Sequence, residues 1–298
     1  MAKNKKKKKS GRPTTLTRAT TTKLLKSAKN KVGVSQRRLV SKYGVSQPTV
    51  HRILKRNNVF KRQRKRAPKY TADQLERISK CCRALRVKHF KKDTFIILDD
   101  EKYFTFAHHT LSGNDHFYTD DISTTPDDVR FAGQGKFEPK ILVWMAISNK
   151  GLSAPYIRPI GGPAVNSDVY IANCLPKLKD FIDAHHSNEN YIFWPDLVSC
   201  HYSKKTLAWL NGQNIPVVPK DANPPNVPAA RPIENFWALL TRLVYDRGWE
   251  AKTERQLINR INRKLKEVDQ NVVQAMMASI RPTLRKIEDN GPLSVLKC

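Results

Sequence analysis

Two acidic residues in the stretch 190–240 stand where their side chains could bind a metal ion. Asp196 closely follows an aromatic run, Tyr191-Ile192-Phe193-Trp194, which we expect to form a short buried strand. Glu234 lies in the first turn of an expected helix that opens at Pro232, after a loop rich in proline and asparagine. Because 37 residues separate the two acids, they belong to different elements and can meet only in the folded chain.

A third acid comes from a segment that starts near residue 93. The apolar run 95–98 predicts a buried strand, and it ends in Asp99-Asp100-Glu101. Ionised carboxylates at the edge of a core repel one another unless a cation lies between them. Mg²⁺ prefers oxygen ligands, and two such ions about 4 Å apart can stabilise the attacking and leaving oxygens of a phosphoryl displacement. We therefore predict that Asp100, Asp196 and Glu234 are catalytic residues that hold Mg²⁺ or Mn²⁺, with two ions.

The elements that must position these acids form an α/β pattern. Their order along the chain is strand, strand, strand, helix, strand, helix, strand, loop and helix, which predicts an RNase H-like catalytic domain over residues 93–298, a mixed sheet flanked by helices. The expected strands and helices are a hairpin at 103–107, strands at 140–148, 154–160 and 215–218, a helix at 168–183, and two helices within 253–290. Residues 108–139 show no periodicity and are expected to form a loop insertion.

The positive charge of the chain is confined to its first third. Residues 1–92 hold 31 Lys and Arg against 2 acids, whereas residues 93–298 hold 24 of each. Such a distribution is typical of a domain that binds the phosphate backbone of double-stranded DNA. No apolar run is long enough to span a membrane, no apolar signal segment follows Met1, and the five cysteines show no CxxC pair, which indicates an intracellular protein with reduced thiols.

The basic third predicts an all-α helix-turn-helix domain at residues 11–60, between a basic disordered tail at 1–10 and a basic linker and helix at 61–92. We expect its helices at 16–31, from Ser35, and at 47–56, the last capped by Ser46 after a tight turn at Gly44. That last helix would enter the major groove, although a three-helix unit that only packs against a partner fits the same pattern.

The residues predicted to contact DNA fall into three groups. Side chains of the recognition helix would read base edges, Arg12 of a Gly-Arg-Pro motif would lie in the minor groove unless this motif is a plain loop, and the cluster at 61–66 would contact phosphates or serve as a nuclear address. They are Arg12, Gln47, Thr49, His51, Arg52, Lys61, Arg62, Arg64, Lys65 and Arg66. The helix that follows, from a capping box at Thr71 and Gln74, is expected to form an interdomain or dimer contact or to pack on its own domain.

Three motifs together resemble the catalytic domain of mariner-like DNA transposases. They are DDEKYF at 99–104, FWPD at 193–196 with His201 five residues after the acid, and RPIENFW at 231–237. The resemblance implies that Asp100, Asp196 and Glu234 form a DDE triad. It also implies a homodimer that cuts and pastes DNA by binding terminal inverted repeats and target DNA. The basic tail at 3–9 could act as an address to the nucleus, bind nucleic acid or be a solvated tail. His201 is expected to support the metal site by positioning Asp196, or to position a substrate phosphate, unless it is a surface histidine. Leu197 stands where the family has Asn.

Two other functions fit part of the pattern. Relatives of this type carry two helix-turn-helix units, and the first is not recognisable here, which favours a non-catalytic or decayed transposase-derived DNA-binding protein. An RNase H-type nuclease explains the acids but not the recognition helix. Metal-dependent nicking of terminal-repeat DNA separates these alternatives.

Overall fold

The computed structural model describes residues 16–62, 64, 67–108, 111, 116–131, 138–162 and 165–296. The chain divides into two units, residues 1–65 and residues 66–297. Each unit has its own hydrophobic core. The predicted tail at 1–10 and the Gly-Arg-Pro motif lie outside the described residues.

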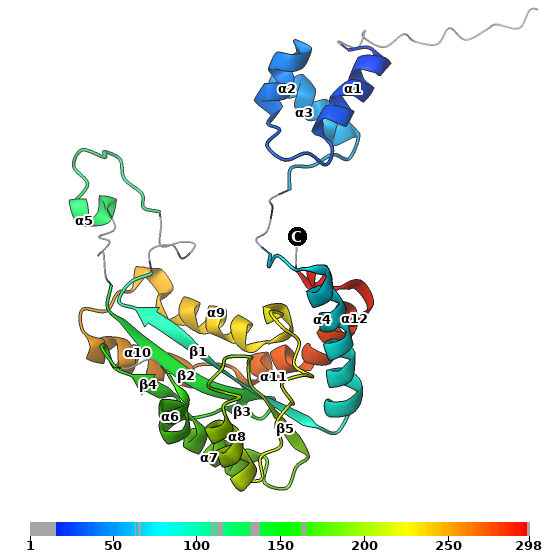
Figure 1. The fold of residues 1–298 in the computed structure, drawn as a ribbon. Helices are drawn as coiled ribbons and strands as arrows, with labels where there is room; N and C mark the ends of the chain where they lie inside the picture. Colours follow the sequence, from blue (N-terminus) through cyan, green and yellow to red (C-terminus); the bar gives the residue numbers. More distant parts are fainter. Residues whose placement is uncertain are drawn as a thin grey trace, which may run out of the picture. The chain divides into compact units, whose positions relative to one another are not determined.

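The first unit is a bundle of three short helices, drawn in blue in Figure 1. They are α1 (Arg18–Ala28), α2 (Gln36–Tyr43) and α3 (Gln47–Arg56). Ser35 caps α2 by accepting a hydrogen bond from the amide of Arg38 at 3.1 Å. Gly44 ends α2 with a φ of 62°, a conformation that glycine adopts without strain. The core of this unit consists of five buried apolar side chains, Leu24, Leu39, Val45, Val50 and Leu54. Helices α1 to α3 thus form a three-helix unit in which a tight turn joins α2 to α3, as in a helix-turn-helix domain.

A five-stranded mixed sheet organises the second unit. Its strands are β1 (Phe95–Thr105), β2 (Lys140–Ser148), β3 (Gly151–Leu152), β4 (Tyr156–Arg158) and β5 (Tyr191–Trp194). The strand order is β3-β2-β1-β5, and β4 also pairs with β2. Strand β1 runs antiparallel to β2 and parallel to β5, which makes β1 the central strand of the sheet.

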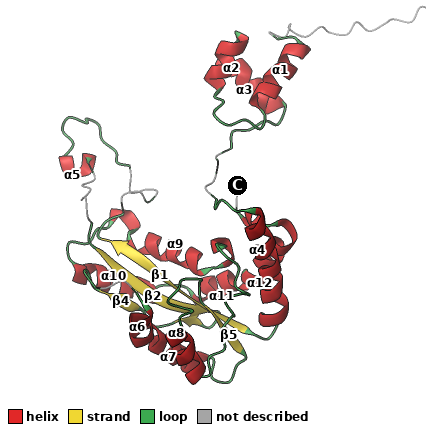
Figure 2. Cartoon of the chain, in the orientation of Figure 1, coloured by secondary structure: helices red, strands yellow, loops and turns green. Residues whose placement is uncertain are grey.

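Helices cover both faces of this sheet, as Figures 1 and 2 show. Those of the second unit are α4 (Ala72–Ala84), α5 (Asp127–Arg130), α6 (Ser167–Val169), α7 (Leu175–His185), α8 (Lys204–Gly212), α9 (Ile233–Val244), α10 (Glu254–Lys266), α11 (Gln270–Ala278) and α12 (Ile280–Asn290). Short π-helical turns at Leu85–His89 and Tyr170–Cys174 extend α4 and join α6 to α7. No helix in the described part of the chain is long and apolar enough to cross a membrane.

Alternate residues of β1 and β2 enter two different cores. Ile96, Leu98 and Met145 pack with the helices α4 and α9 to α12, whereas Ile97 and Trp144 pack with α7 and α8. This alternation follows from the two-residue period of a strand, and burial on both faces explains why β2 is apolar almost throughout. Each large apolar side chain that is fully buried contributes about 1.5–3 kcal/mol to the free energy of folding.

Helix α9 is held against the sheet by its apolar stripe. Ile233, Phe236, Trp237 and Leu240 are each at most 1% exposed, and they recur at the three- and four-residue spacing of one helix face. Glu234 lies between them in the first turn and is exposed. The stripe therefore fixes the direction in which the first turn of α9 presents this carboxylate.

Helix α4 belongs to the second unit. Thr71 and Gln74 form the predicted capping box, and Ile78, Cys82 and Leu85 are buried in the same core as the sheet. The helix packs on α12, where Arg86 donates to both carboxylate oxygens of Glu288 at 2.8 and 3.2 Å. The catalytic domain was predicted to start at residue 93, whereas the packing of α4 places residues 72–89 within the second unit.

Three sequence predictions about secondary structure were wrong. Strand β1 does not end at the acids but continues to Thr105, because β2 pairs with it from Leu98 to Thr105. The expected strand at 215–218 is a single bridge between Val217 and Phe193, since Pro216 and Pro219 have no amide hydrogen to donate. The segment 253–290 forms three helices rather than two, because Asp269 caps a separate α11.

Candidate active site

The three consecutive acids of β1 point to both faces of the sheet. Asp99 lies on the α7 side, where its carboxylate accepts from Trp144, and Asp100 lies on the α9 side, where its carboxylate accepts from Trp237. Strand β5 ends at Trp194, which is level with Leu98 on β1. The acids therefore emerge where the parallel neighbour stops, although they lie in the middle of β1 and not at its end.

Asp100 is a half-buried carboxylate whose negative charge is disfavoured by its surroundings. Its Oδ2 accepts from the indole Nε1 of Trp237 at 3.0 Å. Burial, opposed by the guanidinium of Arg231 and aided by the charge of Glu234, raises the pKa of Asp100 to about 7. The negative charges of Asp100 and Glu234 thus act on each other, and a cation between them would relieve the repulsion.

Asp196 lies two residues beyond the end of β5, in contact with a buried histidine. Its Oδ1 accepts from the amide of Val198 at 3.1 Å and is 2.5 Å from Nδ1 of His201. This second contact is an ion pair between the carboxylate and the imidazole. Burial alone would raise the pKa of Asp196, but His201 and the Val198 amide hold it below its usual value.

His201 is fully buried beside three carboxylates. Its Nε2 is 3.7 Å from Oε1 of Glu101, and its ring centroid lies 4.5 Å from that of Tyr170. Burial disfavours the imidazolium, but the charge of Asp99 and the contact with Asp196 raise the pKa of His201 well above its usual value. The residue predicted to support the metal site therefore contacts one predicted ligand, Asp196.

Asp99 is a buried acid whose neighbours the sequence analysis did not identify. Its Oδ2 accepts from the hydroxyl of Tyr170 at 2.5 Å and from Nε1 of Trp144 at 3.1 Å. Burial raises the pKa of Asp99, and the nearby charge of His201 opposes that rise. The run of three acids in the sequence signals a special position, but nothing in it shows that Tyr170 and Trp144 are the partners.

Arg231 joins the strand ends and was also missed as a site residue. Its Nη2 donates to the carbonyl of Asp99 at 2.8 Å, and its Nη1 donates to the carbonyl of Trp194 at 3.1 Å. It lies three residues before Glu234, whose amide donates to the Arg231 carbonyl at 3.2 Å. Its position in the RPIENFW motif is the only sequence signal for this role.

The structure brings the three predicted acids to one region without closing a metal site. Asp100 and Glu234 act on each other electrostatically, while Asp196 is turned toward His201. Within the described residues, no three His, Cys, Asp or Glu side chains lie close enough to hold a metal ion. The donor set nevertheless fits a hard divalent cation, because it consists of carboxylates and the charge of Glu234 disfavours the ionised form of Asp100.

The predicted DNA-binding residues lie in the first unit and in the segment after it. Gln47, His51 and Arg52 on α3 are exposed, whereas Thr49 is half-buried and its Oγ1 lies 2.9 Å from Oγ of Ser46. Three members of the basic cluster are also exposed, namely Lys61, Arg62 and Arg64. Arg12, Lys65 and Arg66 lie outside the described residues.

Comparison with known proteins shows similarity to transposases over most of the chain. The chain is 25% identical over 247 residues to the transposable element Tc3 transposase of Caenorhabditis elegans, a match that covers 81% of this chain and 69% of that protein. The Mos1 transposase in a paired-end complex with the left transposon end superposes with a TM-score of 0.75 at 17% identity, covering 98% of this chain and 83% of that one. No protein-family model matches the chain.

The chain is thus similar in sequence to the Tc3 transposase and in fold to the Mos1 transposase. The catalytic domain of Mos1 mariner transposase superposes with a TM-score of 0.58 at 14% identity, and the match covers 76% of this chain and 98% of that domain. The predicted fold class is therefore confirmed. In this chain the acids lie on β1, after the end of β5 and in the first turn of α9, all within the second unit.

Proposed function

We propose that the protein is a cut-and-paste DNA transposase that binds terminal inverted repeats and catalyses metal-dependent strand cleavage and strand transfer. The observation that carries this proposal is the half-buried Asp100, whose carboxylate accepts from Trp237 at 3.0 Å and is acted on by the charge of Glu234. Asp196 follows the end of the adjacent parallel strand. Negative charge concentrated in this way is suited to a divalent cation, and the similarity to Tc3 and Mos1 transposases supports the assignment.

Asp100, Asp196 and Glu234 would supply oxygen ligands for Mg²⁺ or Mn²⁺, with two ions. When bound, such ions activate water and stabilise the charge that develops in an in-line phosphoryl displacement. Trp237 fixes the Asp100 carboxylate through the bond to Oδ2, and His201 holds Asp196 beside β5. Glu234 is exposed, so its side chain can reorient toward a ligand more readily than the other two.

Recognition of the terminal repeats would belong to the first unit. Gln47, His51 and Arg52 are exposed on α3 and carry the donors and acceptors that read base edges in the major groove. Thr49, with its hydroxyl turned toward Ser46, would contribute less. The remaining predicted contacts, to phosphates and the minor groove, are Arg12, Lys61, Arg62, Arg64, Lys65 and Arg66.

We also propose a homodimer that acts in the nucleus. The described part of the insertion, residues 116–131, exposes Phe117, Tyr118, Ile122 and Phe131. Exposed aromatic side chains on a projecting segment suit contact with a second copy of the chain. The clustered Lys and Arg residues of the first third support transport to the nucleus.

A nicking assay tests the proposed activity. The substrate is duplex DNA that carries the inverted repeats flanking the coding sequence in its genome, with Mg²⁺ or Mn²⁺ added. Strand cleavage should disappear in Asp196→Asn and in Glu234→Gln, while binding to the same DNA is retained. Asp180→Asn, which changes an exposed acid of α7, is the matched control and should cut normally.

The alternative functions correspond to other outcomes of this assay. Binding without metal-dependent cutting by the wild type would identify a non-catalytic DNA-binding protein. Cutting that needs the acids but shows no preference for repeat DNA would identify a nuclease of RNase H type.

A further inference from the structure

Arg231 contacts both strands that lead to the catalytic acids. Its guanidinium donates to the carbonyl of Asp99 at 2.8 Å and to that of Trp194 at 3.1 Å. The first carbonyl belongs to the residue before Asp100, and the second to the last residue of β5, two positions before Asp196. The guanidinium carbon also lies 5.2 Å from the centre of the Trp194 ring, so the side chain is held by three contacts.

These carbonyls lie where the parallel pairing of the sheet stops. The last residue pair of β1 and β5 is Leu98 with Trp194, so no further strand pairing fixes the distance between the two chains beyond it. A planar guanidinium can donate to two acceptors at once, whereas an ammonium on a flexible stem cannot fix two directions in the same way. Arg231 therefore replaces the missing strand pairing at this point.

The same residue is bonded to the element that carries the third acid. The carbonyl of Arg231 accepts from the amide of Glu234 at 3.2 Å, which anchors the first turn of α9. Its charge opposes the rise in the pKa of Asp100 and lowers that of Asp196, which is consistent with a position between the two carboxylates. One side chain and its peptide thus connect β1, β5 and α9.

We propose that Arg231 is a positioning residue that sets the spacing of Asp100, Asp196 and Glu234 for metal binding. This inference rests on the proposed function, since it assumes that the three acids hold the metal. Arg231 acts through the two strand-end carbonyls and its own peptide, not by touching DNA or metal. Loss of a residue that orients metal ligands typically weakens metal affinity about 10- to 100-fold.

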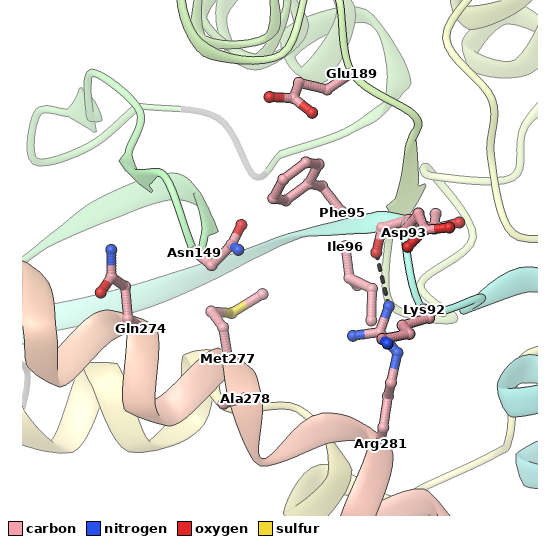
Figure 3. Close-up of a pocket in the computed structure, with 11 residues that line it drawn as sticks. Lys92, Asp93, Phe95, Ile96, Asn149, Glu189, Gln274, Met277, Ala278 and Arg281 are labelled. Carbon is pink, nitrogen blue, oxygen red and sulfur yellow. Dashed lines mark hydrogen bonds between the residues drawn. The ribbon is translucent and has the colours of Figure 1, made fainter.

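The second unit offers a matched control at the other end of β1. Arg281 on α12 donates to the carbonyls of Phe90, Lys91 and Thr94 at 3.1, 2.6 and 2.8 Å. It lines a cavity of about 760 Å³ with Lys92, Asp93 and Phe95 (Figure 3), at the start of the strand and away from the acids. Both Arg231 and Arg281 donate to backbone carbonyls. Of the two, only Arg231 is bonded to residues beside the catalytic acids, so Arg281 is the matched control.

The experiment compares Arg231→Lys, Arg231→Gln and Arg281→Lys in the full chain. Mn²⁺ binding is measured by titration at about pH 8 without DNA, and tryptophan fluorescence during heating reports the stability of each variant. We expect both Arg231 variants to bind Mn²⁺ at least about tenfold more weakly than the wild type, and Arg281→Lys to bind it within about twofold. In the nicking assay, excess Mn²⁺ should restore much of the activity of Arg231→Lys.

Each other outcome overturns the inference in a distinguishable way. Equal losses of Mn²⁺ affinity in the Arg231 and Arg281 variants, in proportion to lost stability, would show a purely structural role. Tighter binding by Arg231→Gln with unchanged binding by Arg231→Lys would show that the guanidinium only competes with the metal. A wild-type chain that neither binds Mn²⁺ nor cuts DNA would refute the proposed function itself, and the inference with it.

Discussion

Replacing Asp100 by asparagine should stabilise the metal-free protein, and more so at high pH. Burial and Glu234 raise the pKa of Asp100 to about 7 from a usual value of 3.8. As the pH rises above about 4, the unfolded chain releases this proton before the folded chain does, so the carboxylate costs stability. Asp100→Asn removes that cost and leaves an amide oxygen to accept from Nε1 of Trp237.

The size of the effect follows from the difference between the two pKa values. At about 1.4 kcal/mol for each pKa unit, the cost approaches about 4 kcal/mol near pH 8.5 and falls to about 2 kcal/mol near pH 5.5. We therefore expect Asp100→Asn to be more stable than the wild type at both values, with the gain at the higher pH larger by about 2 kcal/mol. Added Mg²⁺ should narrow the gap, because a bound cation compensates the wild-type carboxylate.

Urea unfolding in the presence of a chelator measures this gain. All five tryptophans lie between Trp144 and Trp249, in the second unit, so tryptophan fluorescence follows the unit that contains Asp100. Asp180→Asn on α7 is the control and should show no such pH-dependent gain. An Asp100→Asn variant no more stable than the wild type near pH 8.5, or one that gains more at about pH 5.5, would refute the electrostatic reasoning.

Two further predictions concern the DNA-binding unit and α4. Arg52→Ala should reduce the preference for the selected sequence over random duplex, whereas neutralising Lys61, Arg62 and Arg64 should weaken binding to every sequence and lower the salt slope by up to about 0.9 for each lost phosphate contact. Competition binding over a range of salt concentrations distinguishes the effects of these two changes. An equal loss of specificity from both would mean that α3 is not the recognition helix. Thr71→Ala removes a capping box and should cost about 1 kcal/mol in urea unfolding, whereas Thr71→Ser should cost little; equal losses would contradict the capping role.

The parts of the fold set by local chemistry were predictable from the sequence. The bounds of α3 and β2 match the expected segments. A proline in the first turn marks a helix start, although Ser46 makes no side-chain cap bond to α3, and an unbroken apolar run marks a strand buried on both faces. The length of β1 was not predictable, since polar residues up to Thr105 become strand only by pairing with a β2 segment more than 30 positions away.

The candidate site shows the same division between local and distant information. The three acids were identified from residue type and from their positions beside apolar runs. Their supporting contacts were not, because Tyr170 and Arg231 reach Asp99 across 71 and 132 residues of sequence. The orientation of Asp196 toward His201 likewise depends on burial of the imidazole, which spacing alone does not reveal.

Anomalous scattering from crystals of the full chain soaked in Mn²⁺ tests the central claim most directly. The account predicts a peak bounded by the carboxylates of Asp100, Asp196 and Glu234, with Asp196 drawn away from His201 and metal–oxygen distances of about 2.1 Å. A saturating soak that leaves no Mn²⁺ among these three residues, or that places the ion on other side chains, would contradict it.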